Sequence, residues 1–138
     1  MTYRLIHPQL LDALGRAGHG STVLIADANY AHSTGGAPAA ERVHLNLRPG
    51  LLTTDQVLEV LLDAIPVEAA ATMVGPEGQD SPAITGFAAT LDGVPFERLQ
   101  REPFRAAARS ADLAVLIATG DTRHYANLLL TIGALPGT

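Results

Sequence analysis

Residues 22–26 read Thr-Val-Leu-Ile-Ala and are followed by Asp27, and residues 113–118 read Leu-Ala-Val-Leu-Ile-Ala. Both runs are short and apolar, and both contain β-branched residues, which is typical of strands buried in a sheet. Helix patterns alternate with strand patterns along the rest of the chain. The sequence therefore predicts an α/β fold, with one layered domain over residues 1–138 and one central sheet flanked by helices.

Residues that start and stop helices bound the helix patterns. Pro8 precedes leucines at helical spacing, and Thr53 or Thr54 can cap a helix that Pro66 ends. The sequence predicts helices over 8–17, 54–65, 82–91 and 103–110. Further strands are predicted at 43–47, where apolar and polar residues alternate, at 67–74 and at 125–132.

Charge and composition narrow the possible functions. Nine Lys and Arg against 14 Asp and Glu give a net charge of −5, so we expect no nucleic-acid partner, because binding phosphates needs a basic surface. The chain has no cysteine, which excludes disulfides, thiolate metal sites and a cysteine nucleophile. No apolar run approaches the roughly 18 residues of a membrane span, so we expect no membrane partner and a cytoplasmic location. Only 17% of residues are charged, and the apolar surface this leaves on a small domain favours a homo-oligomer.

Polar residues gather next to the two most apolar strands, and α/β folds hold their sites at strand ends. Residues 27–41 are too long for a simple connection, which is typical of a functional loop. Because this loop is poor in large apolar residues, we expect it to make few contacts in a monomer and to be ordered by a neighbouring subunit. The candidates form two groups: Gly18, His19, Gly20, Asp27, Asn29, Tyr30, His32 and Ser33, and then residues 119–127.

His19 and Asp27 each allow two interpretations. The His19 ring can cap the last turn of the preceding helix, or its two glycine neighbours can leave it open to a substrate as an acid and base near neutral pH. Asp27 can cap a turn, or it can orient His19 or accept a substrate hydroxyl. The sequence leaves both questions open.

Tyr125 and Asn127 are two residues apart, so on an extended segment their side chains would share a face. A phenol beside a carboxamide suits a polyhydroxylated ligand, although Tyr125 can equally be half-buried while Asn127 turns the chain.

Possible metal ligands are His19, Asp27, His32 and His124. Their spacings match no ligand motif, so we expect no metal. Ser33 lacks the Gly-x-Ser-x-Gly pattern of a hydrolase nucleophile.

These motifs together resemble the L-fucose mutarotase / D-ribose pyranase family. The resemblance rests on Gly18-His19-Gly20, Asp27-Ala28, Ala31-His32-Ser33, Gly120-Asp121 and the run from Tyr125 to Leu130, in that order over nearly the whole chain. It implies a cofactor-free isomerase that interconverts the ring forms of a monosaccharide. It also implies a ring-shaped homo-oligomer, often a decamer, with sites at subunit boundaries.

Carried over by position, the resemblance makes His19 the catalytic acid and base and Asp27 a substrate-binding carboxylate. It makes Tyr125, Ala126 and Asn127 a substrate-binding segment, with His32 as a further candidate for sugar contact. The segment at His32 is nearer the fucose branch and Tyr-Ala-Asn is nearer the ribose branch, so the sugar stays open. Family members commonly place a sugar-contacting Arg or His where this chain has Pro103, and Arg101 or Arg105 is the candidate replacement.

The expected chemistry is simple acid and base catalysis. Opening a pyranose ring needs a proton on the ring oxygen while the anomeric hydroxyl loses one, and an imidazole can serve both directions. The competing interpretation is a ring protein that binds a sugar or another small ligand without turnover.

Overall fold

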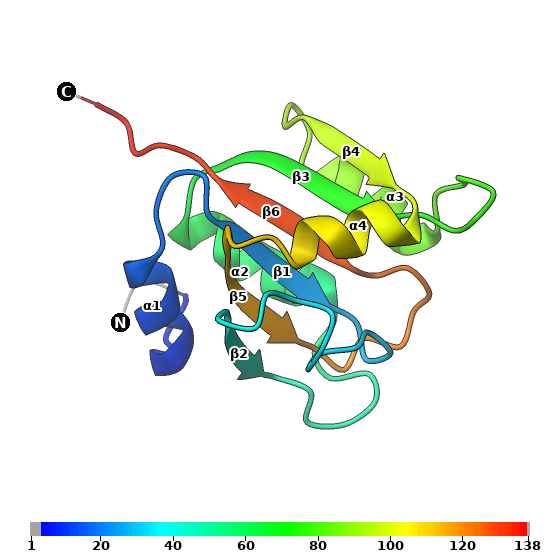
Figure 1. The fold of residues 1–138 in the computed structure, drawn as a ribbon, viewed down its shortest axis with the longest axis horizontal. Helices are drawn as coiled ribbons and strands as arrows, with labels where there is room; N and C mark the ends of the chain where they lie inside the picture. The colour runs from blue at the N-terminus through cyan, green and yellow to red at the C-terminus, as the bar shows by residue number, and fades with distance from the viewer. Residues whose placement is uncertain (1–3, 138) are drawn as a thin grey trace.

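Six strands form one mixed sheet in the part of the chain that the computed structural model describes, residues 4–137. The sheet order is β2-β5-β1-β6-β3-β4 (Figure 1). Its strands are β1 Thr22–Ala26, β2 Glu41–His44, β3 Val67–Met73, β4 Phe96–Leu99, β5 Leu113–Ala118 and β6 Leu128–Ile132. The helices are α1 Pro8–Arg16, α2 Thr54–Ala64, α3 Pro82–Thr90 and α4 Arg101–Ala108. The predicted α/β fold with one sheet flanked by helices is confirmed.

Strand direction creates one edge of the sheet where most carboxyl ends meet. β1 pairs in parallel with β5, β5 with β2, and β3 with β4. β6 runs antiparallel to both of its neighbours, β1 and β3. The carboxyl ends of the other five strands therefore share an edge with the beginning of β6.

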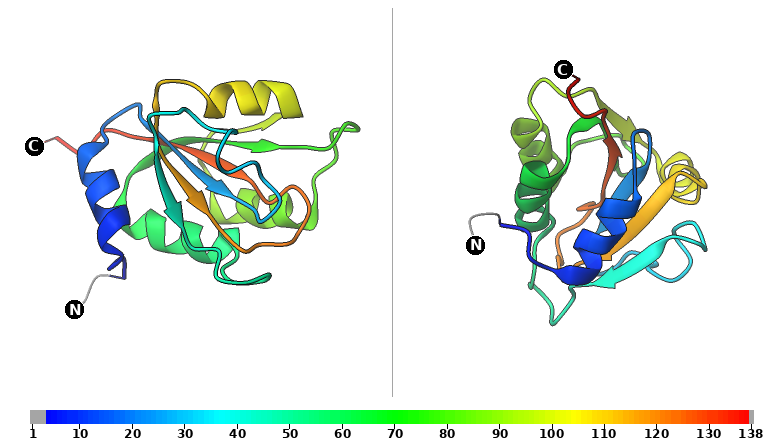
Figure 2. Two further views of the ribbon diagram at one scale, coloured as in Figure 1. Left: turned by 60° about the horizontal axis from the view of Figure 1, so that its bottom comes forward. Right: turned by 90° about the vertical axis from the view of Figure 1, so that its left-hand side faces the viewer.

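The side chains of the central strands alternate between two apolar layers. Val23 and Ile25 of β1 pack with α1, α2 and α3 on one face of the sheet. Leu24 and Ala26 pack with Phe104 of α4 and with the loop after β1 on the other face. Figure 2 shows the sheet between these layers. No helix within residues 4–137 is long and apolar enough to cross a membrane.

The predicted helix boundaries are largely confirmed. His7 caps α1 by accepting a hydrogen bond from the N–H of Leu10, and Pro8 occupies its first turn. Thr53 and Gln56 form a reciprocal capping box at α2, which ends before Pro66. α4 begins at Arg101 and not at Pro103, because the third helical residue has no backbone acceptor for its N–H and so tolerates proline.

Two strand predictions need correction, and one strand was missed. β2 covers 41–44 and not 43–47, because β5, its only partner among the described residues, ends at Ala118. β4 was not predicted from the sequence. β6 begins at Leu128 and not at Tyr125, because Tyr125 adopts a left-handed conformation with φ of 54°.

Arg42 organises the long loop after β1 within a single chain. Its guanidinium donates hydrogen bonds to the carbonyls of five residues of the loop: His32, Ser33, Gly36, Ala37 and Ala40. Tyr30 is buried in the same apolar layer as Phe104, and its hydroxyl donates a hydrogen bond to the carbonyl of Gly35 at 2.5 Å. The expectation that the loop makes few contacts in a monomer is therefore wrong, because one arginine satisfies the backbone that apolar residues do not cover.

Candidate functional site

A cavity of about 300 Å³ opens at the shared carboxyl edge of the sheet. Its walls come from the end of β1 and the following loop, the end of β3, α4, and the turn before β6. The lining residues are Asp27, Asn29, Tyr30, Ala31, Met73, Arg101, Arg105, His124, Tyr125 and Asn127. The cavity lies where the sequence placed a site, next to the ends of the apolar strands.

Asp27 is the buried carboxyl group of this cavity, with 4% of its surface exposed. Burial raises the pKa of Asp27, and the nearby charge of Asp121 raises it further. Backbone N–H groups of Ala126, Asn29 and Tyr30 oppose this increase. A carboxyl group with a raised pKa, facing a cavity, is a candidate for binding hydroxyls and for proton transfer.

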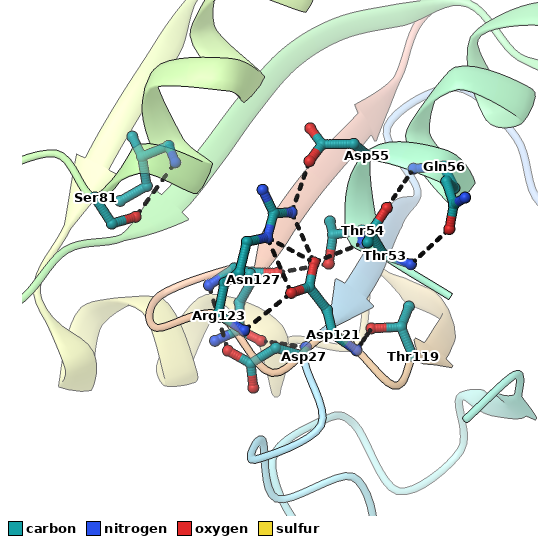
Figure 3. Close-up of polar contacts among 12 residues, drawn as sticks. Asp27, Thr53, Thr54, Asp55, Gln56, Ser81, Thr119, Asp121, Arg123 and Asn127 are labelled. Atoms are coloured by element: carbon teal, nitrogen blue, oxygen red, sulfur yellow. Dashed lines mark hydrogen bonds and ion pairs between the residues drawn. The ribbon is translucent and has the colours of Figure 1, made fainter. Parts of the chain in front are cut away.

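A second buried carboxylate, Asp121, holds the turn that carries the rest of the site (Figure 3). Burial alone would raise the pKa of Asp121, but hydrogen bonds from the Arg123 guanidinium and the Thr54 N–H hold it below its usual range. Arg123 also reaches Asp55 at 2.6 Å. The pKa values of the two buried carboxyl groups therefore shift in opposite directions, downward for Asp121, which holds the turn, and upward for Asp27, which faces the cavity.

Asn127 and Tyr125 both line the cavity, although the segment that carries them is not extended, contrary to the prediction. The Asn127 side chain is buried and accepts the N–H of Asp27 at 2.7 Å, so it fixes the end of β1. Tyr125 remains 36% exposed at the cavity. Ala126 lies beneath them, where its N–H donates to Asp27 and its carbonyl accepts from the Thr54 hydroxyl.

His19 lies at the opposite end of the sheet from the cavity. It precedes β1, whereas Asp27 follows β1, and Figure 1 shows these two loops at opposite ends of the strand. The His19 side chain is 59% exposed, and its Nε2 lies 2.5 Å from a carboxylate oxygen of Glu68. Within one chain, the structure therefore does not bring His19 to Asp27.

His32 also lies outside the cavity lining. Its Nε2 donates to the carbonyl of Asp27 at 2.7 Å, which braces the start of the loop. Its outer side faces a separate shallow hollow that includes Arg42 and His44. Among residues 4–137, no three His, Asp or Glu side chains are grouped so that they would hold a metal ion.

Arg101 and Arg105 both line the cavity, while Pro103 does not. The two arginines are four residues apart on α4 and so project from one side of the helix. Sequence analysis named both only as replacements for Pro103. A helix that starts at Arg101 is the signal that would have grouped them.

Two solved structures similar to this chain are complexes with sugars. One is Bacillus subtilis RbsD complexed with D-ribose, with a TM-score of 0.84, 24% identity and 99% of each chain covered. Another is the fucose mutarotase from Streptococcus pneumoniae in complex with L-fucose, with a TM-score of 0.80, 25% identity and 95% of each chain covered.

Relatives similar in sequence carry the same two kinds of name. A D-ribose pyranase from Streptomyces avermitilis is 33% identical, with 94% of each chain covered. A fucose mutarotase from Bos taurus is 30% identical, with 95% of this chain and 90% of the relative covered. These are names of isomerases, and the chain is an enzyme of that class. It belongs to the RbsD / FucU transport protein family, whose model matches residues 1–135.

Proposed function

We propose that this chain is a cofactor-free monosaccharide mutarotase, acting as a single domain over residues 1–138, that interconverts the ring forms of an aldose. The expected substrate is L-fucose or a related sugar. D-ribose is the other substrate to test, for D-ribose pyranase activity. The observation that carries the proposal is the cavity at Asp27, where a buried carboxyl, an amide and a phenol face one space. Its volume of about 300 Å³ is at the small end of ligand pockets, as suits a monosaccharide.

Asp27, Asn127 and Tyr125 supply complementary contacts for a sugar. The Asp27 carboxyl can accept hydrogen bonds from hydroxyl groups when ionised, or donate one when protonated. Asn127 keeps its amide nitrogen for a sugar oxygen, because its amide oxygen already accepts the N–H of Asp27. The Tyr125 ring can cover a C–H face of the sugar, and its hydroxyl can share a proton with a sugar oxygen.

His19 is proposed as the general acid and base, contributed to the cavity of one chain by a second copy. Its side chain contacts Glu68 but remains more than half exposed before β1, so a second chain can reach it. The contact would join two different surfaces of identical chains, and such contacts form a ring when the rotation closes. This supports a ring-shaped homo-oligomer, with a decamer as the expected size. A cytoplasmic location stays a prediction from the sequence.

The proposal is tested by saturation-transfer NMR, which measures exchange between anomers and ring forms at equilibrium. The wild-type protein should accelerate exchange of L-fucose or D-ribose. His19→Ala should abolish that exchange with little change in thermal midpoint, because the exposed ring contributes little packing. His44→Ala, which removes an exposed histidine outside the cavity, should exchange at the wild-type rate. Wild-type exchange by His19→Ala would show that His19 is not the catalytic group.

A sugar-binding ring protein without turnover is the second candidate, favoured by the separation of His19 from the cavity within one chain. Calorimetry distinguishes it from the enzyme. Tight binding of an aldose with no increase in anomer exchange would establish the binding function.

A further inference from the structure

Two arginines at the cavity differ from every other arginine of the chain. Four of the nine, Arg4, Arg16, Arg98 and Arg123, form ion pairs with carboxylates. Three more, Arg42, Arg48 and Arg109, donate to backbone carbonyls. Arg101 and Arg105 have neither an ion pair nor a hydrogen bond within the described residues, and both line the cavity.

Arg105 is the more constrained of the two. Its Nε is buried and has no hydrogen-bond partner among the described residues, although buried donors are normally satisfied. The charge of Arg105 also reaches the cavity wall, where it opposes the increase that burial causes in the pKa of Tyr30. The cavity therefore holds a cationic donor for which residues 4–137 of one chain supply no acceptor.

The charged groups that line the cavity also leave a positive excess. Two guanidinium groups from α4 line it against a single carboxyl group, that of Asp27, so the arginines are in excess even when Asp27 is ionised. The chain as a whole has a net charge of −5, so a local positive excess does not reflect composition. Neutral hydroxyls can accept hydrogen bonds from these arginines, but only an anion also balances their charge.

We propose that this cavity selects an aldose carrying an anionic group, either a carboxylate or a phosphate, which Arg101 and Arg105 bind while Asp27 and Asn127 hold the sugar hydroxyls. The planar guanidinium forks match the paired oxygens of both groups. The inference rests on the proposed function, because it names the substrate class of the same site. It differs from the ligands named for the related structures, D-ribose and L-fucose, which are neutral.

The test compares sugars that differ only at one carbon. D-galactose is the neutral sugar, D-galacturonate carries a carboxylate at C6, and D-galactose 6-phosphate carries a phosphate there. The dissociation constant of each is measured by calorimetry, and exchange above the spontaneous rate by NMR. We expect at least one anionic sugar to bind about 10-fold or more tightly than galactose, in line with charge-assisted hydrogen bonds. The two anionic sugars together identify which anion is preferred.

Arginine variants assign the preference to its residues. Arg105→Gln should reduce the anionic preference to about 3-fold or less, because it should weaken binding of the anionic sugars more than binding of galactose, and Arg105→Lys should retain part of the preference. Arg48→Gln removes an equal charge from an exposed loop and should keep the full preference. Thermal midpoints and native mass spectra show whether each variant is folded and assembled.

Three results would overturn the inference. One is equal affinity of the wild-type protein for galactose and both anionic sugars. Another is an equal loss of affinity for all three sugars in Arg105→Gln. The third is loss of assembly in Arg105→Gln, which would assign the arginine to a contact between copies. Anion preference without any exchange would support this inference and contradict the proposed enzyme, so the two failures are distinguishable.

Discussion

Two inactive variants of this protein should restore activity to each other when they assemble together. The first is His19→Ala, which lacks the proposed acid and base, and the second is Asp27→Asn, which lacks the cavity carboxyl. If one active site takes His19 from one chain and Asp27 from another, mixed oligomers contain some sites with both groups intact.

Restored activity in mixed oligomers is expected because His19 and Asp27 lie far apart in one chain. β1 has five residues between the two loops and spans about 13 Å at roughly 3.3 Å per residue. A proton transfer needs heavy atoms about 3 Å apart or one bridging water, so the two side chains of one chain do not act on the same sugar. In a random equal mixture, half the cavities carry Asp27 and half the neighbouring contacts carry His19, so about one quarter of the sites are complete.

The assay uses two tags on co-expressed variants and purification through both tags in sequence. Exchange of the preferred aldose is then measured by saturation transfer. The expected rate is about one quarter of wild type per site, against none for each variant alone. The matched control is co-expression of the Asp27→Asn chain with an Asn127→Ala chain. Both changes affect the same cavity wall, so no chain in the mixture carries an intact cavity.

Two results would contradict an active site shared between chains. If mass spectrometry confirms mixed oligomers and exchange does not rise above that of the separate variants, His19 and Asp27 do not act together across two chains. If the wild-type protein keeps full activity as a monomer on dilution, the site needs no second chain.

Four further predictions concern three single residues, Asn127, Asp27 and Arg42, and the expected independence from metal. Asn127→Ala should weaken sugar binding and also lower the free energy of unfolding by about 1–3 kcal/mol, measured by urea denaturation, because it leaves the buried N–H of Asp27 without an acceptor; Asn29→Ala, at an exposed position, should show little loss of stability. The raised pKa of Asp27 means that the folded state binds more protons than the unfolded state, so stability should fall as pH rises from the usual carboxyl range through the folded pKa, and Asp27→Asn should lack this slope in unfolding measured from pH 4 to 7. Arg42→Gln should cost about 2–4 kcal/mol and open residues 27–40 to limited proteolysis, whereas Arg48→Gln should do neither. Activity should survive prolonged treatment with a strong chelator, and loss that zinc or manganese reverses would contradict the metal-free mechanism.

The elements that were predicted correctly carry their own signal. β1 and β5 are apolar on both faces, and α2 has both a cap and a stop in its sequence. β4 was missed because it has four residues at the edge of the sheet, of which Glu97 and Arg98 are exposed, so it shows no apolar run. The end of β2 depends on where β5 ends, and no pattern within residues 41–47 contains that information.

The site was predicted in part for a similar reason. Asp27 directly follows one buried strand and Asn127 belongs to the polar group that follows the other, β5, so strand ends were sufficient to select both, although Asn127 was expected within a strand and lies just before β6. Their hydrogen bond joins residues 100 positions apart and depends on β1 and β6 being neighbours, which the sequence did not indicate. Grouping His19 with Asp27 followed their closeness in sequence and overlooked the strand between them. An intervening strand of five residues separates such a pair, and this rule was available before the structure.

The start of α4 connects the fold to the substrate question. Beginning the helix at Pro103 leaves Arg101 outside it and gives the two arginines no common face. Beginning it at Arg101, with Pro103 as its third residue, places Arg101 and Arg105 one turn apart on the side that lines the cavity. Phe104 is fully buried in the apolar layer between α4 and the sheet, which also contains Leu116, and its burial fixes the rotation of the helix. A change that rotates or shortens α4 should therefore alter charge recognition at the cavity while the walls formed by Asp27 and Asn127 remain in place.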